Sequence, residues 1–443
     1  MNKAVSGSGV VAFWQAVGMR FMPFADAASV DLPLGRLLRL SMFQLSVGMT
    51  VVLLTGTLNR VMIVELGVPT SLVAMMIALP VLAAPARLMI GHRSDNYRSF
   101  LGWRRVPYVW LGTLLQWGGL AIMPFALLLL QSQTTGPQWA APVAAALAFL
   151  LTGAGMHMSQ TAGLALAGDL SPEKRRPRVV ALLYVTLLVG MMAASLAFGL
   201  LLRDFTPLRL IQVIQGAAVF VLVVNVVALW KQEPRNLALS APDRQLPSFR
   251  QSYSRYRTAS GTGRLLLAVA LGSAAFSMQD GLPEPHGGGI PGVSGRQTTM
   301  LTALWAAGTL AGFLLSARLL DRGFDMYRLS AYGVLVGIAA FCLVIFSSLP
   351  ASLAMFRAGA TLIGFGGGMF AVGTMLAAMD LAENSDNGFA IGAWSAAQAT
   401  AIGLALGTGG IVKDVVNSLA LSGSLGQALD GPLSGYLFVY HFE

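Results

Sequence analysis

The chain has 443 residues, of which 55% are hydrophobic and only 11% are charged, whereas a typical soluble protein has about 25% charged residues. Its mean hydropathy is +0.68. These values exclude an ordinary soluble protein and predict an all-α membrane protein with many spans.

The apolar residues form long blocks, and a helix needs about 20 of them to cross the hydrocarbon core of a bilayer. Eleven spans are predicted, at 39–58, 69–91, 106–130, 143–169, 178–202, 208–230, 264–283, 297–320, 327–348, 352–380 and 388–412. Hydrophobicity rises again in GYLFVYHFE at 435–443, where we expect a twelfth span that the sequence cuts short.

These spans divide the chain into four parts. Residues 1–38 are predicted to form an amphipathic segment on the cytoplasmic surface, followed by a six-helix half at 39–230. A polar stretch at 231–263 is the predicted cytoplasmic linker, and 264–443 is the second helical half.

The net charge of +10 has a topological explanation. Most of the 29 lysines and arginines lie in the N-terminal segment and in the loops after the second, fourth, sixth and eighth spans. The positive-inside rule places those regions in the cytoplasm. We therefore expect an inner-membrane protein with a cytoplasmic N-terminus, and no nucleic-acid partner is needed to explain the charge.

The two halves repeat each other. The second span ends in RLMIGHRSD and the eighth in ARLLDRG, so that Asp95 and Asp321 occupy equivalent places. Six spans plus six, with acidic and basic loops after the second span of each half, resemble the major facilitator superfamily, whose halves pack around a midplane cavity. The resemblance implies that Asp95, Arg98, Asp321 and Arg322 tie helix ends together on the cytoplasmic face without touching a substrate.

The interiors of the predicted spans are nearly devoid of acids, because the candidate carboxylates fall at span ends. A proton-coupled carrier needs a carboxylate inside the membrane. Arg87 is the one clear charge within a span, and we expect it to extend toward the cytoplasmic surface. The pattern favours an apolar cargo, or no transport, over a polar solute.

Three long segments, at 32–69, 90–119 and 160–191, resemble the PucC/LhaA family, a branch of the major facilitator fold also called the bacteriochlorophyll delivery family. The resemblance implies an assembly factor of purple phototrophic bacteria that holds or delivers bacteriochlorophyll, with carotenoid as a second pigment. The implied partners are light-harvesting α and β polypeptides, the reaction centre, membrane lipids and chlorophyll synthase or the insertion machinery. The implied location is the inner or intracytoplasmic photosynthetic membrane.

His157 is the candidate pigment ligand, because it alone of the four histidines lies in the middle of a span. The magnesium of bacteriochlorophyll commonly takes an imidazole nitrogen as its axial ligand. Gly153 and Thr161 lie one turn before and after His157 on the same helix face, where the glycine would clear room for a ring and the threonine would orient the imidazole. In the alternative, Gln160 and Thr161 satisfy a histidine that only bonds neighbouring helices.

Three classes of function stay open from the sequence. The first is a pigment-holding assembly factor, the second is a transporter of a lipid-like or small solute by alternating access, and the third is a structural organiser of antenna oligomers. The sequence contains no Gly-rich phosphate loop, nucleophile triad or Cys/His metal motif, so no enzyme is predicted.

Overall fold

The computed structural model describes residues 32–131, 137, 139–236, 246–259, 261–277, 295–347, 352–381 and 387–421. Each regular element in these ranges is a helix. Nine helices within them are long and apolar enough to cross a membrane, and the bent pair α11 (Phe249–Thr258) and α12 (Thr262–Ser277) would make a tenth span. The predicted twelfth span at 435–443 and most of the predicted N-terminal segment lie outside the described residues.

The first span starts earlier and ends later than predicted, because a continuous helical stretch covers Leu34–Glu65. It contains two π-helical turns. In chain order its elements are α2 (Leu34–Ser41), α3 (Phe43–Val52), η2 (Leu53–Thr57), α4 (Leu58–Arg60) and η3 (Val61–Glu65).

The second span is broken into two helices, which the sequence prediction did not foresee. It consists of α5 (Thr70–Leu82) and α6 (Ala86–Asp95). Pro85 has no N–H to give to the Val81 carbonyl, so the N–H of Ala84 bonds to Val81 instead, at 2.9 Å. The Ala84 N–H would otherwise bond to the Pro80 carbonyl, one turn earlier, so that carbonyl loses its helical donor. The helix α5 ends at this break.

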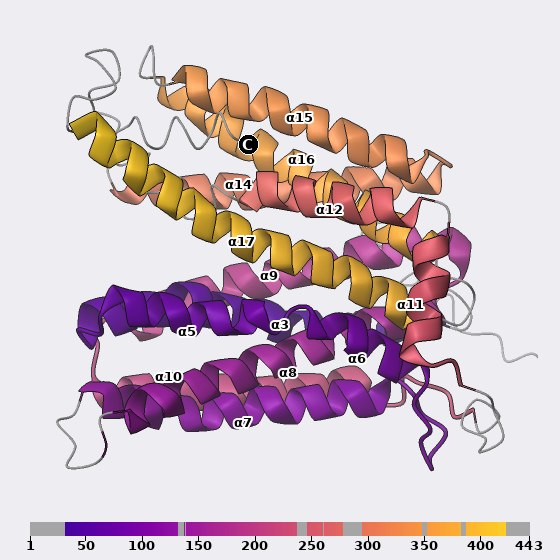
Figure 1. Ribbon diagram of the computed structural model, residues 1–443, viewed down its shortest axis with the longest axis horizontal. Helices are drawn as coiled ribbons and strands as arrows, with labels where there is room; N and C mark the ends of the chain where they lie inside the picture. Colours follow the sequence, from indigo (N-terminus) through magenta and orange to yellow (C-terminus); the bar gives the residue numbers. More distant parts are fainter. Residues whose placement is uncertain are drawn as a thin grey trace, which may run out of the picture.

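The remaining helices lie close to the predicted spans, except that α11 forms within the predicted linker. They are α7 (Val106–Gln131), α8 (Ala140–Leu170), α9 (Arg176–Leu201), α10 (Pro207–Leu229), α11 (Phe249–Thr258), α12 (Thr262–Ser277), α14 (Gly295–Asp321), α15 (Met326–Ser347), α16 (Leu353–Asp380) and α17 (Asn387–Leu421). The spanning helices run roughly along one direction, while α11 lies across their ends (Figure 1). We call this end of the bundle the α11 end.

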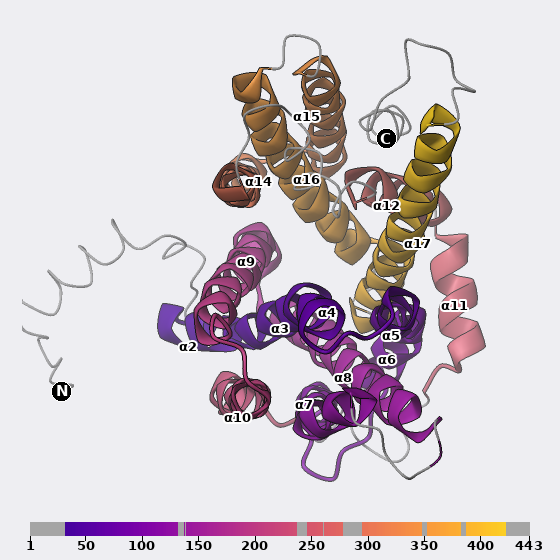
Figure 2. The same cartoon turned by 90° about the vertical axis from the view of Figure 1, so that its left-hand side faces the viewer.

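Viewed along the helices, the bundle shows two groups, with α3 to α10 in one and α12 to α17 in the other (Figure 2). The packing pattern repeats, since α7 lies against α8 and α15 against α16. Glycines allow both close approaches: a Cβ at Gly155 of α8 would overlap the α7 backbone at Gln116, and one at Gly333 of α15 would come within 2.7 Å of the Gly366 carbonyl of α16. Between the groups, α17 packs on α6 and α14 packs on α9.

The loop between the two groups is fastened at both of its described ends. Near its start, Glu233 accepts hydrogen bonds from the backbone N–H groups of Arg104, at 2.8 Å, and Val106, at 2.9 Å, which caps the beginning of α7. Near its end, Phe249 of α11 contacts the His92 ring of α6 edge-on and the Phe389 ring of α17, with ring centroids 5.5 and 6.0 Å away. Helix α11 therefore rests on both groups.

Candidate functional site

A cavity of about 280 Å³ lies between the two groups of helices. Its walls come from α6, α8 and α9 on one side and from α12, α14, α16 and α17 on the other. The volume is at the lower end of the roughly 300–1,000 Å³ of small-molecule pockets.

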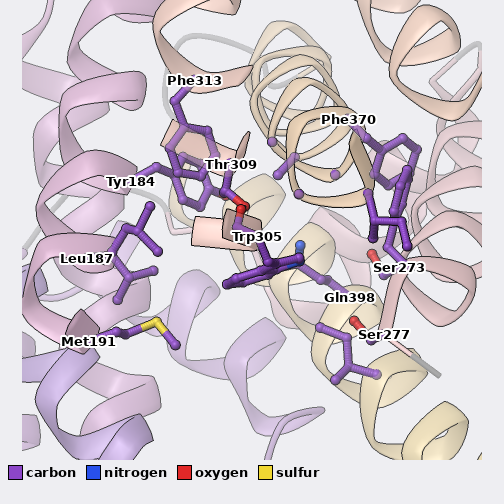
Figure 3. A pocket seen from close by; sticks show the side chains of 18 of the residues that line it. Tyr184, Leu187, Met191, Ser273, Ser277, Trp305, Thr309, Phe313, Phe370 and Gln398 are labelled. Atoms are coloured by element: carbon purple, nitrogen blue, oxygen red, sulfur yellow. The ribbon is translucent and has the colours of Figure 1, made fainter. Parts of the chain in front are cut away.

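Several aromatic rings line the cavity. Tyr184 of α9 stacks on Phe313 of α14, with ring centroids 5.1 Å apart and planes inclined by 27°. On another side, the ring centroids of Phe276 of α12 and Phe370 of α16 lie 5.8 Å apart. Trp305 projects into the space between the Tyr184–Phe313 pair and Phe370 (Figure 3). Such a surface suits a ligand with an extended apolar or aromatic face.

Arg87 also lines the cavity, and the expectation that it extends toward the membrane surface is wrong. Its side chain is buried, with 5% of the residue exposed. Its Nε donates a hydrogen bond to the Thr161 hydroxyl at 3.1 Å, and Nη2 donates to the Gln160 side-chain oxygen. Both acceptors are neutral, and no described carboxylate pairs with Arg87.

Two further polar groups in the cavity wall are buried without a partner, the hydroxyls of Tyr184 and Ser273. Buried hydroxyls in a protein normally find a hydrogen-bond partner. These two groups, together with Arg87, give the otherwise apolar cavity the capacity to recognise polar atoms of a ligand.

The glycines of α16 mostly serve helix packing. A Cβ at Gly364 would overlap the Trp305 carbonyl of α14, and a Cβ at Gly368 would lie 2.8 Å from the Thr309 carbonyl. Gly367 differs, because its Cβ would meet Phe276 at an ordinary 3.5 Å. Gly364, Gly367 and Gly368 all line the cavity, so the close approach of α14 to α16 shapes its wall.

His157 is buried between α8 and α5 and is not among the residues that line the cavity. Its Nε2 lies 3.0 Å from the Pro80 carbonyl, the group that the break in the second span deprives of a helical donor. Nε2 must therefore carry the proton and donate. The other ring nitrogen, Nδ1, is buried without a partner and keeps its lone pair.

The other residues predicted to bind pigment with His157 contact protein side chains. A Cβ at Gly153 would overlap the Pro80 ring, so Gly153 makes room for α5 and the expectation that it clears space for a ligand ring is wrong. Thr161 and Gln160 accept hydrogen bonds from Arg87. Of the four residues predicted to bind pigment, Gln160 alone lines the cavity. His157 as a magnesium ligand stays a prediction.

A second polar cluster lies at the α11 end, where Asp95 is almost completely buried. Its carboxylate pairs with Arg105 and accepts the backbone N–H groups of Gly388, at 3.0 Å, and Phe389, at 2.6 Å. Arg105 also donates through Nε to Asp169 at 2.9 Å. We call these groups the Asp95 network. The carboxylate sits at the N-terminus of α17, where the helix dipole favours a negative charge.

Arg105 keeps its positive charge despite complete burial. Burial alone would lower the pKa of its guanidinium, but the charges of Asp169 and Asp95 outweigh that effect and hold the pKa above its usual range. Asp169 is fixed from the other side by Asn387, whose side-chain amide donates to it at 3.0 Å. The Asp95 network thus joins α6, α7 and α8 to the start of α17.

The equivalent aspartate of the second half also bridges the two groups of helices. Asp321, at the end of α14, pairs with Arg178 of α9. Arg98 and Arg322 lie exposed at the α11 end. Asp95 and Asp321 thus contact the opposite half, and the role of all four residues as cytoplasmic ties stays a prediction.

The two-group bundle with its central cavity is the fold of the major facilitator superfamily, which solved membrane transporters share. The proton:xylose symporter XylE of that superfamily superposes with a TM-score of 0.64 and 14% identity, covering 92% of this chain and 93% of that chain. At this identity the likeness shows the fold alone, and it confirms the predicted fold class.

Within this class, residues 57–443 match the family described as PUCC protein. A protein of Rhodobacter capsulatus described as "Uncharacterized protein in puhA-bchM intergenic region" is 54% identical over 97% of this chain and 90% of its own length. Protein PucC of Rhodovulum sulfidophilum is 51% identical over 90% of this chain and 89% of its own. The chain belongs to the PucC family.

Proposed function

We propose that the chain is an assembly factor for bacterial light-harvesting complexes that holds bacteriochlorophyll and delivers it to antenna polypeptides. The observation that carries the proposal is the cavity between the two halves, which is lined by several aromatic rings and, among the described residues, by no carboxylate. This lining is suited to an aromatic macrocycle and unsuited to a cationic solute.

The cavity accommodates part of a chlorin pigment. A chlorin with its hydrocarbon tail has a larger volume than 280 Å³, so the two halves must move apart for the whole pigment to enter. Trp305, Phe276 and Phe370 would then contact the face of the ring. Magnesium supplies an open coordination position in such a pigment, and the unpartnered Nδ1 of His157 has the donor chemistry to fill it once the wall opens. A carotenoid would use the same apolar walls.

The proposed partners, the light-harvesting α and β polypeptides and the reaction centre, would dock on membrane-facing helix surfaces. Helix α7 supports this proposal, because Trp110 and Trp117 lie seven residues apart and are each 39% exposed. Membrane lipids cover the same surfaces in the absence of a partner. Chlorophyll synthase or the insertion machinery would be the source of pigment or of new polypeptides.

We place the protein in the inner or photosynthetic membrane with the α11 end in the cytoplasm. Helix α11, the last turn of α6 and the loops beside them carry exposed arginines, among them Arg93, Arg98, Arg250 and Arg257. The positive-inside rule favours this orientation. The N-terminus then also lies in the cytoplasm, and no catalytic role is proposed.

Alternating-access transport is the second candidate, and one observation favours it. The Asp95 network and the Arg178–Asp321 pair join the two halves at the α11 end, as a two-sided gate requires. Uptake of a solute into liposomes that contain only this protein would support the transporter.

The test of the assembly function combines a gene deletion with purification. Deletion in a phototrophic host should lower the level of antenna and leave rings around the reaction centre incomplete. Protein purified from that host in mild detergent should carry bacteriochlorophyll in its absorption spectrum and retain antenna polypeptides. Unchanged antenna level and ring completeness in the deletion strain would overturn the assembly role.

A further inference from the structure

Arg87 presents an unusual charge balance for a membrane interior. It lies eight residues before Asp95, which is about 12 Å along an α-helix, and is 5% exposed. A buried charge in a membrane protein is costly unless it is paired or faces a functional cavity. The Arg87 guanidinium is held by the neutral side chains of Gln160 and Thr161, and its Nη1 has no described partner.

Among the described residues that line the cavity, Arg87 therefore has no side chain of opposite charge beside it. The Tyr184 hydroxyl, which is buried and unpartnered, lies near enough to Arg87 for the two groups to interact electrostatically. Phe313 lies eight residues before Asp321, as Arg87 does before Asp95, and it faces the same cavity. The second half thus supplies an aromatic ring where the first half supplies a cation.

We propose that the cavity binds an amphipathic monocarboxylate. Its carboxylate pairs with Arg87 and accepts a hydrogen bond from the Tyr184 hydroxyl. Its apolar body lies against Trp305, Phe276 and Phe370. Arg87, the one charged side chain among the described lining residues, balances a single negative charge, which favours a carboxylate over a phosphate monoester. The planar guanidinium fork also matches the geometry of a carboxylate.

Two kinds of molecule carry this chemistry. One is a chlorin with a free acid side chain, and its presence in the cavity rests on the proposed function. The other is a fatty acid from the surrounding lipid. The chlorin would deepen the proposed function, because it would mean that the protein accepts the pigment as an acid before a hydrocarbon alcohol is attached.

The experiment compares acids with their methyl esters on the purified full-length protein. One pair is pyropheophorbide a and its methyl ester, which carry no magnesium and so test the charge alone. The other pair is palmitate and methyl palmitate. Binding at pH 7.5 is followed by quenching of tryptophan fluorescence, since Trp305 and Trp394 line the cavity. We expect the wild-type protein to bind at least one acid about 10-fold or more tightly than its ester.

Arg87→Gln should remove this preference by weakening the acid about 10-fold and leaving the ester within about 2-fold. Arg60→Gln is the matched control, because Arg60 carries the same charge on an exposed side chain that pairs with Glu65 away from the cavity. It should keep the full preference. Tyr184→Phe keeps the ring and removes the hydroxyl, and should weaken the acid about 3- to 10-fold.

Equal affinities of the acids and their esters in the wild-type protein would overturn the inference, whether or not Arg87→Gln folds. Equal loss of acid and ester in Arg87→Gln or Tyr184→Phe would do the same. Arg87-dependent binding of palmitate with no chlorin binding would keep the inference and remove the pigment from this cavity. Tight binding of the chlorin ester alone would keep the proposed pigment and reject the anion site.

Discussion

Asp95 and Phe389 lie 294 residues apart in the chain, yet the Asp95 carboxylate accepts the Phe389 backbone N–H at 2.6 Å. The same carboxylate pairs with Arg105. The buried Asp95 side chain therefore neutralises the buried Arg105 and caps the N-terminus of α17, a helix of the other group. Asp95 thus contributes to the contact between the halves at the α11 end, beside the Arg178–Asp321 pair.

Asp95→Asn should destabilise the protein by roughly 3 kcal/mol, because it leaves the buried Arg105 with one carboxylate and weakens the cap of α17. The measurement is thermal unfolding of the purified protein in detergent. Asp204→Asn is the control, since Asp204 is exposed in the loop before α10. An equal midpoint for both variants would show that the Asp95 network contributes nothing to the contact.

Gly91→Ala should push α6 and α17 apart, because the new methyl group would overlap the Gly388 carbonyl of α17. We expect weaker packing at the α11 end, measured as faster labelling of a cysteine placed at Phe389. Gly118→Ala is the control, since a Cβ at Gly118 meets nothing within 4 Å. Unchanged labelling of the Gly91→Ala variant would contradict the close contact of the two helices.

Two substitutions of His157 separate its two roles. His157→Leu removes the hydrogen bond to Pro80 and should cost roughly 0.6–2 kcal/mol of stability. His157→Gln can still donate to that carbonyl and should recover part of this loss. If Nδ1 ligates magnesium, both variants will carry less bacteriochlorophyll per protein than the wild type. An unchanged pigment-to-protein ratio in both variants would remove His157 as the ligand.

A reporter inserted after Ser248 tests the orientation. Ser248 caps the start of α11, at the end of the bundle that we place in the cytoplasm. A phosphatase reporter should be inactive there, and a fluorescent protein that needs a reducing compartment should be active. The opposite pattern would reverse the proposed topology, while the fold itself would stand.

The sequence was sufficient for the approximate limits of most spans that the structure describes, because hydrophobicity decides them locally. It also contained the cause of the broken second span, since Pro85 lacks the N–H that the Val81 carbonyl needs. The consequence for His157 was missed, because its partner is a carbonyl on another helix. Such a contact leaves no trace in the spacing around His157.

The cavity could not be predicted from local pattern. Tyr184, Trp305 and Phe370 come from three helices and are indistinguishable by sequence from other aromatic residues of apolar spans. Arg87 offered a signal, as the one clear charge inside a span, but we expected it to reach the membrane surface. Its burial depends on Gln160 and Thr161, which a neighbouring span brings to it.

Because both ends of the loop between the two groups of helices are held by contacts, the covalent link between the groups matters less for their packing. Glu233 holds the start of the loop to α7, and Phe249 holds its end to α6 and α17, so the contacts on either side do not need an intact covalent link between them. The peptide chain then contributes mainly effective concentration, keeping two complementary fragments near each other. Two separately synthesised polypeptides, split between these anchors, would need only sufficient density in the same membrane to reassemble.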